Sequence, residues 1–366
     1  VTLSLDPARL PAVDWASHAF FDGDRALPFQ IHDQNSNGQA DEIFLLVDLE
    51  ANQSLNVEIK PVETMPVFPK RTQAELSHKV GCTWEGREYE GGEFQNVSEL
   101  RVPAEHTDHS WYIRYEGPGW ESDKVGYRFY LDWRNATDIF GKTTTEMVLQ
   151  DVGQDGFDSY HELSDWGMDV LKVGESLGLG TFATWQDGKA ERVAVTDSVY
   201  CAITANGPVQ SMIHTTYYGW EASGKKQNLE SDLSITAGSR LTRHQLQWAE
   251  SLDSVCTGIV TLDNTELLTS TEGEWGYLAT WGKQSLNDDQ LGMAVLFKTA
   301  DLLEITTDEH SQVVVLRPSP DNSLTYYFLG AWEKEPEGIT NKADFEAYLK
   351  AEVQKLAQPL KIDYNK

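Results

Sequence analysis

Alternating apolar and polar residues mark extended strands along most of the chain. Segments rich in β-branched and aromatic residues include RVAVTDSVYCAIT (192–204), QSMIHTTYYGW (210–220), LTRHQLQWAE (241–250) and QVVVLRP (312–318). Gly, Pro, Asn and Asp interrupt them at short intervals, and no regular helical pattern separates successive strands. The pattern therefore predicts an all-β fold, a large antiparallel β-sandwich over residues 1–336.

One helix is predicted at the end of the chain, within residues 337–366. The stretch TNKADFEAYLKAEVQKLAQPL offers Thr340 or Asn341 as N-cap and Pro359 as terminator. Apolar side chains recur on one face of this helix, at Phe345, Leu349, Val353 and Leu356. We expect the helix to pack on the sandwich.

The segment HDQNSNGQADEIF (32–44) has oxygen donors at alternate positions, as a calcium loop does. Asp33, Asn35 and Asn37 are the donors, and Gly38 stands where such a loop turns. A calcium hand next requires a Glu six positions after the glycine, and Phe44 stands there. Apolar runs on both sides predict a β-hairpin with an Asn-Gly turn instead. A bound structural calcium in the same loop stays open as an alternative.

Composition limits the classes of partner. The 366 residues, 40% of them hydrophobic, can bury a substantial core. Acidic residues number 58 against 29 basic ones, a net charge of −29, so we expect no nucleic-acid partner. No apolar run is long enough to cross a bilayer, and we expect no membrane insertion. The three cysteines, Cys82, Cys201 and Cys256, leave one disulfide or buried free thiols open.

A first candidate constellation lies in GYRFYLDWRNATDIFGK (126–142). The period of two places four polar side chains on one face of a strand: Arg128, Tyr130, Asp132 and Arg134. The segment WYIRYEGPGWES upstream adds Arg114 and Trp120. An ion-pair ladder on a wet surface explains the pattern as well as a binding site does.

A second constellation lies in SYHELSDWGMDVLKVGESLGLG (159–180). His161, Asp165 and Asp169 allow a metal set, but the spacing excludes the H-E-x-x-H zinc motif. Trp166 and Lys172 lie in the same segment and are candidates for binding a sugar. The glycines of GESLGLG lack the ending of a phosphate-binding loop.

A third constellation is HTTYYGW (214–220). Strand geometry places His214, Tyr218 and Trp220 on one face and Tyr217 on the other. A row of aromatic residues with a histidine suits a sugar-binding cleft, because pyranose rings pack their C–H faces on aromatic rings. The alternative is that these aromatic side chains belong to the core.

The segments GWESDKVGYRFYLDWRNATDIFGK and YHELSDWGMDVLKVGESLGLG resemble the bacterial family catalogued as domain of unknown function 4861. The hairpin at 31–49 and ITAGSRLT (235–242) look like the family's pattern as well. Members lie in polysaccharide-utilisation loci beside polysaccharide lyases and unsaturated-uronyl hydrolases. The resemblance implies a periplasmic or secreted protein with a galactose-mutarotase-like β-sandwich, and a marine relative looks like an ulvan oligosaccharide dehydratase.

What the resemblance implies for activity is a carbon–oxygen lyase that acts on uronic-acid-containing oligosaccharides by β-elimination. Such chemistry needs a base, a cation for the carboxylate and an acid for the leaving oxygen. Candidates by residue type are His161 or Tyr130 as base, Arg128, Arg114 or Lys172 for the carboxylate, and Tyr217, Tyr218 or His214 as acid, with Trp120, Trp166 and Trp220 to bind sugar rings.

Two alternatives stay open, a glycoside hydrolase that uses paired carboxylates and a non-catalytic carbohydrate-binding protein. We expect an oligosaccharide as the partner and no required cofactor. The sequence leaves the glycan, the linkage and the oligomeric state open.

Overall fold

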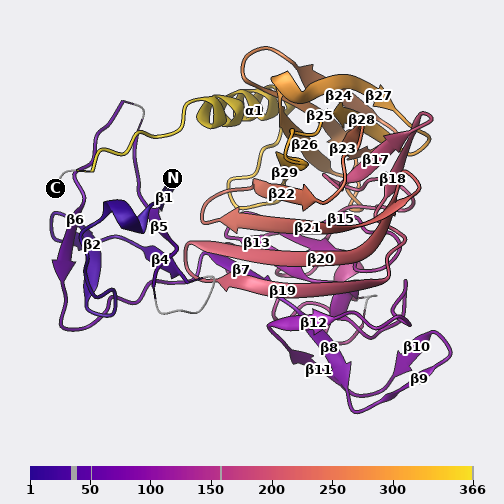
Figure 1. Ribbon diagram of the computed structural model, residues 1–366, viewed down its shortest axis with the longest axis horizontal. Helices are drawn as coiled ribbons and strands as arrows, with labels where there is room; N and C mark the ends of the chain where they lie inside the picture. The colour runs from indigo at the N-terminus through magenta and orange to yellow at the C-terminus, as the bar shows by residue number, and fades with distance from the viewer. Residues whose placement is uncertain (34–38, 51, 157–158, 365–366) are drawn as a thin grey trace.

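The computed structural model describes residues 1–33, 39–50, 52–156 and 159–364. Its main layer is a nine-stranded antiparallel sheet that runs across the body of the molecule (Figure 1). The strands, in spatial order, are β12 (Glu99–Arg101), β19 (Ser198–Asn206), β20 (Gln210–Ala222), β21 (Lys225–Thr236), β22 (Thr242–Trp248), β29 (Ser323–Trp332), β26 (Gln290–Lys298), β25 (Trp275–Lys283) and β24 (Thr265–Ser270).

Two five-stranded sheets form the opposing layer. One has the order β16 (Gly167–Asp169), β15 (Thr137–Lys142), β14 (Gly126–Phe129), β13 (Gly119–Ser122) and β7 (Thr72–Glu75). The other has the order β18 (Lys189–Arg192), β17 (Ala183–Gln186), β23 (Val255–Val260), β28 (Ser311–Leu316) and β27 (Leu302–Thr307). This arrangement confirms the predicted all-β sandwich.

Strict alternation along the long strands builds the core. In β22, Thr242, His244, Leu246 and Trp248 are buried, and the residues between them are exposed. Side chains from all three sheets meet in one apolar cluster, because each sheet turns one face inward. The outer faces of the layers are therefore where polar groups gather.

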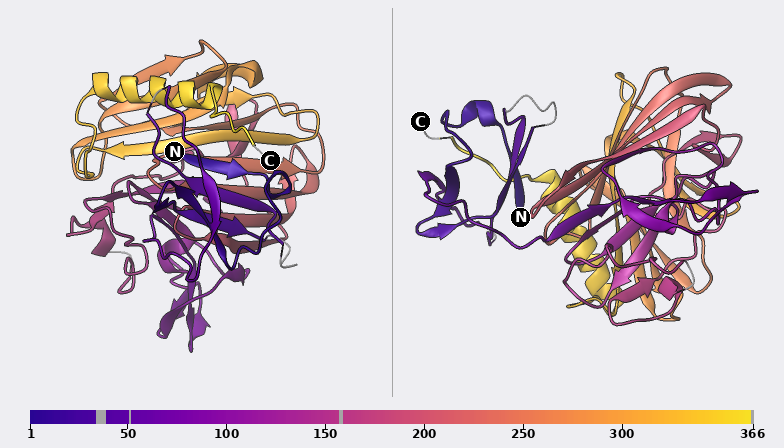
Figure 2. Two further views of the ribbon diagram at one scale, coloured as in Figure 1. Left: turned by 90° about the vertical axis from the view of Figure 1, so that its left-hand side faces the viewer. Right: turned by 90° about the horizontal axis from the view of Figure 1, so that it is seen from below.

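The C-terminal helix α1 (Lys342–Ala357) confirms the predicted element. The side chain of Asn341 caps it by accepting a hydrogen bond of 3.0 Å from the Asp344 N–H. Phe345 and Leu349 are fully buried, and the Phe345 ring lies 5.2 Å from that of Trp281 on β25. The helix thus covers the outer face of the nine-stranded sheet near β25 (Figure 2).

Residues 1–68 form a smaller body beside the sandwich, which we call the N-terminal module (Figure 1). Its strands are β1 (Thr2–Leu5), β2 (His18–Asp22), β3 (Arg25–Ala26), β4 (Phe29–His32), β5 (Glu42–Leu46) and β6 (Glu58–Pro61). Strands β4 and β5 pair antiparallel, as the predicted hairpin requires. The module has an apolar cluster of its own, to which Ile362 of the C-terminal tail contributes. The predicted boundary at residue 336 stays a prediction.

Two small hairpins extend from the sandwich between β7 and β12. We call residues 77–96 the arm; its strands are β8 (Ser77–Val80), β9 (Thr83–Glu85), β10 (Glu88–Glu90) and β11 (Glu93–Asn96) (Figure 1). Short 3-10 helices are η1 (Pro7–Arg9), η2 (Arg114–Glu116), η3 (Ser159–His161) and η4 (Thr299–Asp301).

The three cysteines are free thiols: Cys201 and Cys256 are buried, and Cys82 is partly exposed. Burial raises the pKa of Cys201 to about 12, so this thiol is inert at neutral pH. Of the helices that the structure describes, none is both long and apolar enough to span a bilayer.

Candidate functional site

A buried layer of charged and tyrosine side chains covers the outer face of the sheet that contains β14 and β15. Arg128, only 3% exposed, lies at its centre. Its Nη2 is 2.7 Å from Oδ2 of both Asp138 and Asp169, and its Nη1 donates to the Tyr160 hydroxyl at 2.8 Å. The Tyr130 hydroxyl accepts from Nη2 at 2.7 Å. We call these five residues the Arg128 network.

Burial keeps the Tyr130 hydroxyl protonated. Burial raises the pKa of this phenol well above its usual range, although the charge of Arg128 opposes the shift. The hydroxyl also donates to Asp138 Oδ2 at 2.7 Å. Burial, followed by the charge of Asp169, raises the pKa of Asp138 to about 6. Tyr130 is therefore poorly suited to the role of a base.

His161 lies at the open end of the same network. Its side chain is 42% exposed, and its Nε2 is 3.4 Å from Oδ2 of Asp169, a carboxylate with 1% exposure. Its ring lies 4.7 Å from that of Tyr160, which fixes the ring from a second side. An imidazole that contacts solvent and is oriented by a buried carboxylate has the geometry of a general base.

A second guanidinium, that of Arg134, extends the layer. It lies 3.8 Å over the Tyr130 ring and forms an ion pair with Asp132. Its Nη1 is 2.9 Å from Asp108 Oδ1, and its Nη2 is 3.0 Å from Glu116 Oε1. Burial acts to raise the pKa of Glu116, but the guanidinium charges outweigh it and lower that pKa. Glu116 is therefore ionised at neutral pH.

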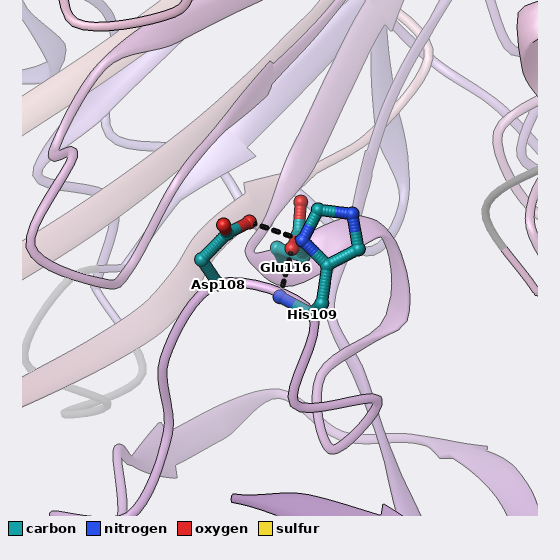
Figure 3. Close-up of side chains that lie close together, drawn as sticks. All are labelled: Asp108, His109 and Glu116. Atoms are coloured by element: carbon teal, nitrogen blue, oxygen red, sulfur yellow. Dashed lines mark hydrogen bonds and ion pairs between the residues drawn. The ribbon is translucent and has the colours of Figure 1, made fainter.

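Asp108, His109 and Glu116 together have the donor types of a cation site (Figure 3). The Asp108 carboxylate is directed at Nδ1 of His109, 2.6 Å away, and Glu116 accepts from the His109 backbone N–H at 2.7 Å. Arg134 already supplies positive charge to both carboxylates at the distances given above. The geometry thus favours a guanidinium clamp, and the cluster does not require a metal.

The backbone of this same segment is strained. Four non-glycine residues within a stretch of eight have a positive backbone φ: His109 (57°), Trp111 (60°), Tyr115 (36°) and Glu116 (71°). Positive φ is rare outside glycine and costs most for bulky residues, so such residues persist only where tertiary contacts hold them. Strained residues of this kind gather at functional sites. The sequence gives no signal of this strain, because the residue types alone do not reveal φ.

A cavity of about 360 Å³ opens beside the strained segment. Its lining comes from three places in the chain: the arm, the strained segment and the loop before η3. The lining residues are Lys79, Gly92, Glu93, Phe94, Trp111, Gln154, Asp155 and Gly156. None of these lining residues belongs to the Arg128 network.

The structure brings together the polar residues predicted on 126–142, although β14 ends at Phe129. Arg128 and Tyr130 share a hydrogen bond, and Arg134 stacks on Tyr130. The structure adds Asp138 and Tyr160 to the candidates. Asp169 belonged to a predicted metal set, and it instead pairs with Arg128.

Other candidates lie on the opposite side of the sandwich. His214 is on the outer face of β20, with Nδ1 2.8 Å from Asp232 Oδ1 and Nε2 2.9 Å from Glu230 Oε2. The hydrogen bond that the His214 imidazolium donates to the Asp232 carboxylate raises the pKa of His214. Tyr218 shares this outer face and lies under the Arg101 guanidinium. These residues cannot act on the same sugar ring as His161, because the whole sandwich separates them.

Three aromatic candidates are core residues. Tyr217 is 2% exposed, and Trp220 is 1% exposed. Trp120 is fully buried, and its indole N–H donates to the Thr242 hydroxyl at 2.8 Å. The bulge of β20 after Tyr217 turns Trp220 inward, so strict alternation misplaces it on the face of His214. As placed in this structure, none of the three reaches a ligand.

The remaining candidates are scattered. Arg114 is fully buried and pairs with Glu75 at 2.5 Å, so it supports the fold. Trp166 is half-buried and packs edge-on against Phe140, beneath the Arg128 network. Lys172 is exposed.

The weak calcium candidates fall largely outside the described residues. Asn35 and Asn37 are among the residues that the structure does not describe, and Asp33 is partly exposed at the end of β4. The structural calcium therefore stays a prediction.

The fold and the charged layer define an all-β sandwich protein with a solvent-exposed histidine on a buried ionised network. The chain belongs to the family described as "Domain of unknown function (DUF4861)", whose model matches residues 7–362. It is also similar to the protein named "Uncharacterized protein P7" of Formosa agariphila, with 26% identity over 207 residues. That match covers 56% of this chain and 51% of the relative, so the chain spans about half the length of the curated relative.

Proposed function

We propose that the protein is a carbon–oxygen lyase that acts on uronic-acid-containing oligosaccharides by β-elimination, with His161 as the base. The observation that carries the proposal is the pair of His161 and Asp169, in which a buried carboxylate orients an exposed imidazole 3.4 Å away. Nearly every other group of the layer is too buried to meet a sugar.

In the proposed reaction, neutral His161 takes the proton from the carbon next to the uronate carboxylate. The electron pair of that C–H bond forms a C=C double bond, and the C–O bond at the next carbon breaks with its electrons on oxygen. The departing oxygen takes up a proton; in a dehydratase it leaves as water. Asp169 stabilises the imidazolium that forms, and the ion pair with Arg128 Nη2, at 2.7 Å, holds the Asp169 carboxylate in place.

Negative charge develops on the substrate carboxylate during this step, so a cation near it lowers the barrier. Arg134 is the guanidinium of the layer with more solvent access, with its side chain 12% exposed against 3% for Arg128. We assign it the role of drawing the carboxylate toward the layer. A wholly buried, fully paired Arg128 instead acts through Asp169.

Hydrolysis by two carboxylates has less support. Asp138 and Asp169 are each 1% exposed, and one Arg128 nitrogen lies 2.7 Å from both. Neither can activate a water or protonate a glycosidic oxygen without leaving that contact.

The test is mass spectrometry of products from unsaturated ulvan, alginate and pectin oligosaccharides. Elimination creates an ultraviolet-absorbing double bond or lowers the mass by one water. Hydrolysis instead raises the summed mass of the products by one water. We expect His161→Ala to lower turnover by about 10²- to 10⁴-fold. The matched control is His310→Ala, because His310 is similarly exposed and lies 3.6 Å from Glu175.

Equal turnover by wild type and His161→Ala would remove the proposed base. Products heavier by one water would replace the lyase with a hydrolase. Tight binding in calorimetry with unchanged masses across the panel would instead identify a non-catalytic carbohydrate-binding protein.

A further inference from the structure

The cavity beside the strained segment has the composition of a sugar-binding site. Aromatic rings come from Phe94 and Trp111, and polar groups come from Lys79, Gln154 and Asp155. Sugar sites combine an aromatic surface for the C–H face of the ring with a few polar groups for its hydroxyls. A volume of about 360 Å³ is at the small end for a ligand site and suits one pyranose ring.

The structure holds Trp111 firmly at this cavity. Its backbone has a φ of 60°, which a tryptophan keeps only under tertiary constraint. Gly156, with a φ of 122°, passes against the ring: a Cβ at this position would lie 2.4 Å from Cη2 of Trp111. Only glycine allows that approach, so the loop before η3 fixes the place of the indole. A ring fixed in this way is a preorganised surface for stacking.

Lys79 supplies a cation to the lining of the cavity. Its Nζ lies 5.2 Å from the Trp111 ring centroid and 5.4 Å from that of Phe94, its cross-strand partner on β11. Among the residues that the structure describes, no carboxylate lies within ion-pairing distance of this ammonium. In a protein with 58 acidic and 29 basic residues, a half-buried lysine without such a partner can accept an anion from a ligand.

We propose that this cavity is a subsite for one uronate residue of the oligosaccharide, a proposal that rests on the function proposed above. The sugar ring stacks on Trp111, its carboxylate pairs with Lys79, and its hydroxyls bond to Gln154, Asp155 and Glu93. Residues 154–156, which line the subsite, precede η3 and His161 in the chain. The subsite therefore anchors the substrate beside the reacting unit and selects for acidic sugars.

The test measures binding separately from turnover. Isothermal calorimetry uses His161→Ala protein, which we expect to consume the ligand much more slowly than wild type does, with the same ulvan, alginate and pectin oligosaccharides. A second set carries the carboxylates reduced to alcohols. Trp111→Ala should weaken binding of both sets by about tenfold, because the stacking surface is lost.

Lys79→Met should weaken binding of the acidic set by about tenfold and leave the reduced set unchanged. Lys79→Arg keeps the charge and should restore most of that affinity. The matched control is Lys225→Met, because Lys225 is exposed at the start of β21 and its loss removes the same charge.

Wild-type affinity in both Trp111→Ala and Lys79→Met would overturn the subsite, whatever the activity of the enzyme. An equal loss for acidic and reduced sugars in Lys79→Met would overturn the selection for uronate. If these variants lose binding but wild type gives no product, the subsite stands and the lyase proposal fails. If wild type is active and the variants bind normally, the lyase proposal stands and the subsite proposal fails.

Discussion

His244 should make the protein less stable in mild acid. The residue is 3% exposed in the core of the nine-stranded sheet, where Nε2 is 2.8 Å from the Ser231 hydroxyl and Nδ1 is 2.8 Å from the Tyr326 hydroxyl. The Tyr326 hydroxyl also donates to the Gly180 carbonyl at 2.8 Å, so its proton is committed. Burial disfavours the charged imidazolium and lowers the pKa of His244 to about 3.

The sign and size of the effect follow from linkage. Between the usual pKa of about 6.5 and the folded value, the unfolded chain binds a proton at His244 and the folded protein does not. The unfolded state then binds more protons, so the free energy of unfolding falls as the pH falls. For these two pKa values, the loss between pH 8 and pH 5 is about 2 kcal/mol, and it grows further toward pH 3.

The assay is urea unfolding of wild type and His244→Gln at pH 5, 6, 7 and 8, followed by tryptophan fluorescence. The substitution itself destabilises the core at every pH, so the informative quantity is the change of unfolding free energy with pH. Burial lowers the pKa of His32 and His106 as well, and their contribution is common to both proteins. We expect His244→Gln to lose about 2 kcal/mol less than wild type between pH 8 and pH 5. Equal losses in the two proteins would refute the reasoning, and His310→Gln should behave as wild type.

Two further predictions concern stability. The substitution Arg128→Met leaves Asp138 and Asp169 buried without their cation. It should lower the free energy of unfolding by about 3–5 kcal/mol in urea titrations. A loss below about 1 kcal/mol would contradict an ionised network. Removal of residues 359–366 takes away Ile362, which packs in the N-terminal module, and Tyr364, whose ring lies 4.1 Å under the Arg9 guanidinium. Hydrogen exchange should then speed up in residues 1–68 and stay unchanged in the sandwich; uniform exchange across both would show that the tail does not fasten the module.

Part of the charged layer could be predicted from one strand. Arg128, Tyr130, Asp132 and Arg134 alternate in sequence, and the structure brings them into one connected group. The same rule of alternation misplaced Trp220, because the bulge in β20 changes the register by one residue. Local pattern therefore identifies polar groups well only where a strand is regular.

The contacts between residues that lie far apart in the sequence could not be predicted. Asp169 is 41 residues from Arg128 along the chain, and Lys79 is 32 residues from Trp111. No periodicity relates them, because their contact depends on how β14, β15, β16 and the arm pair and fold over one another. The close packing of the Trp111 ring against Gly156 likewise joins two loops that are far apart in sequence.

Local sequence patterns specify the class of fold, the C-terminal helix with its cap, and the residue types available for chemistry. Alternation and capping are local, and each follows from a few neighbouring residues. Which of these residues meet depends on tertiary packing: His161 lies beside Asp169, and His214 lies on the opposite side of the sandwich. Tertiary packing also buries Trp120 and Tyr217 in the core. Burial of the apolar faces determines which sheets pack against each other. That packing in turn determines which polar faces remain on the outside to form a site.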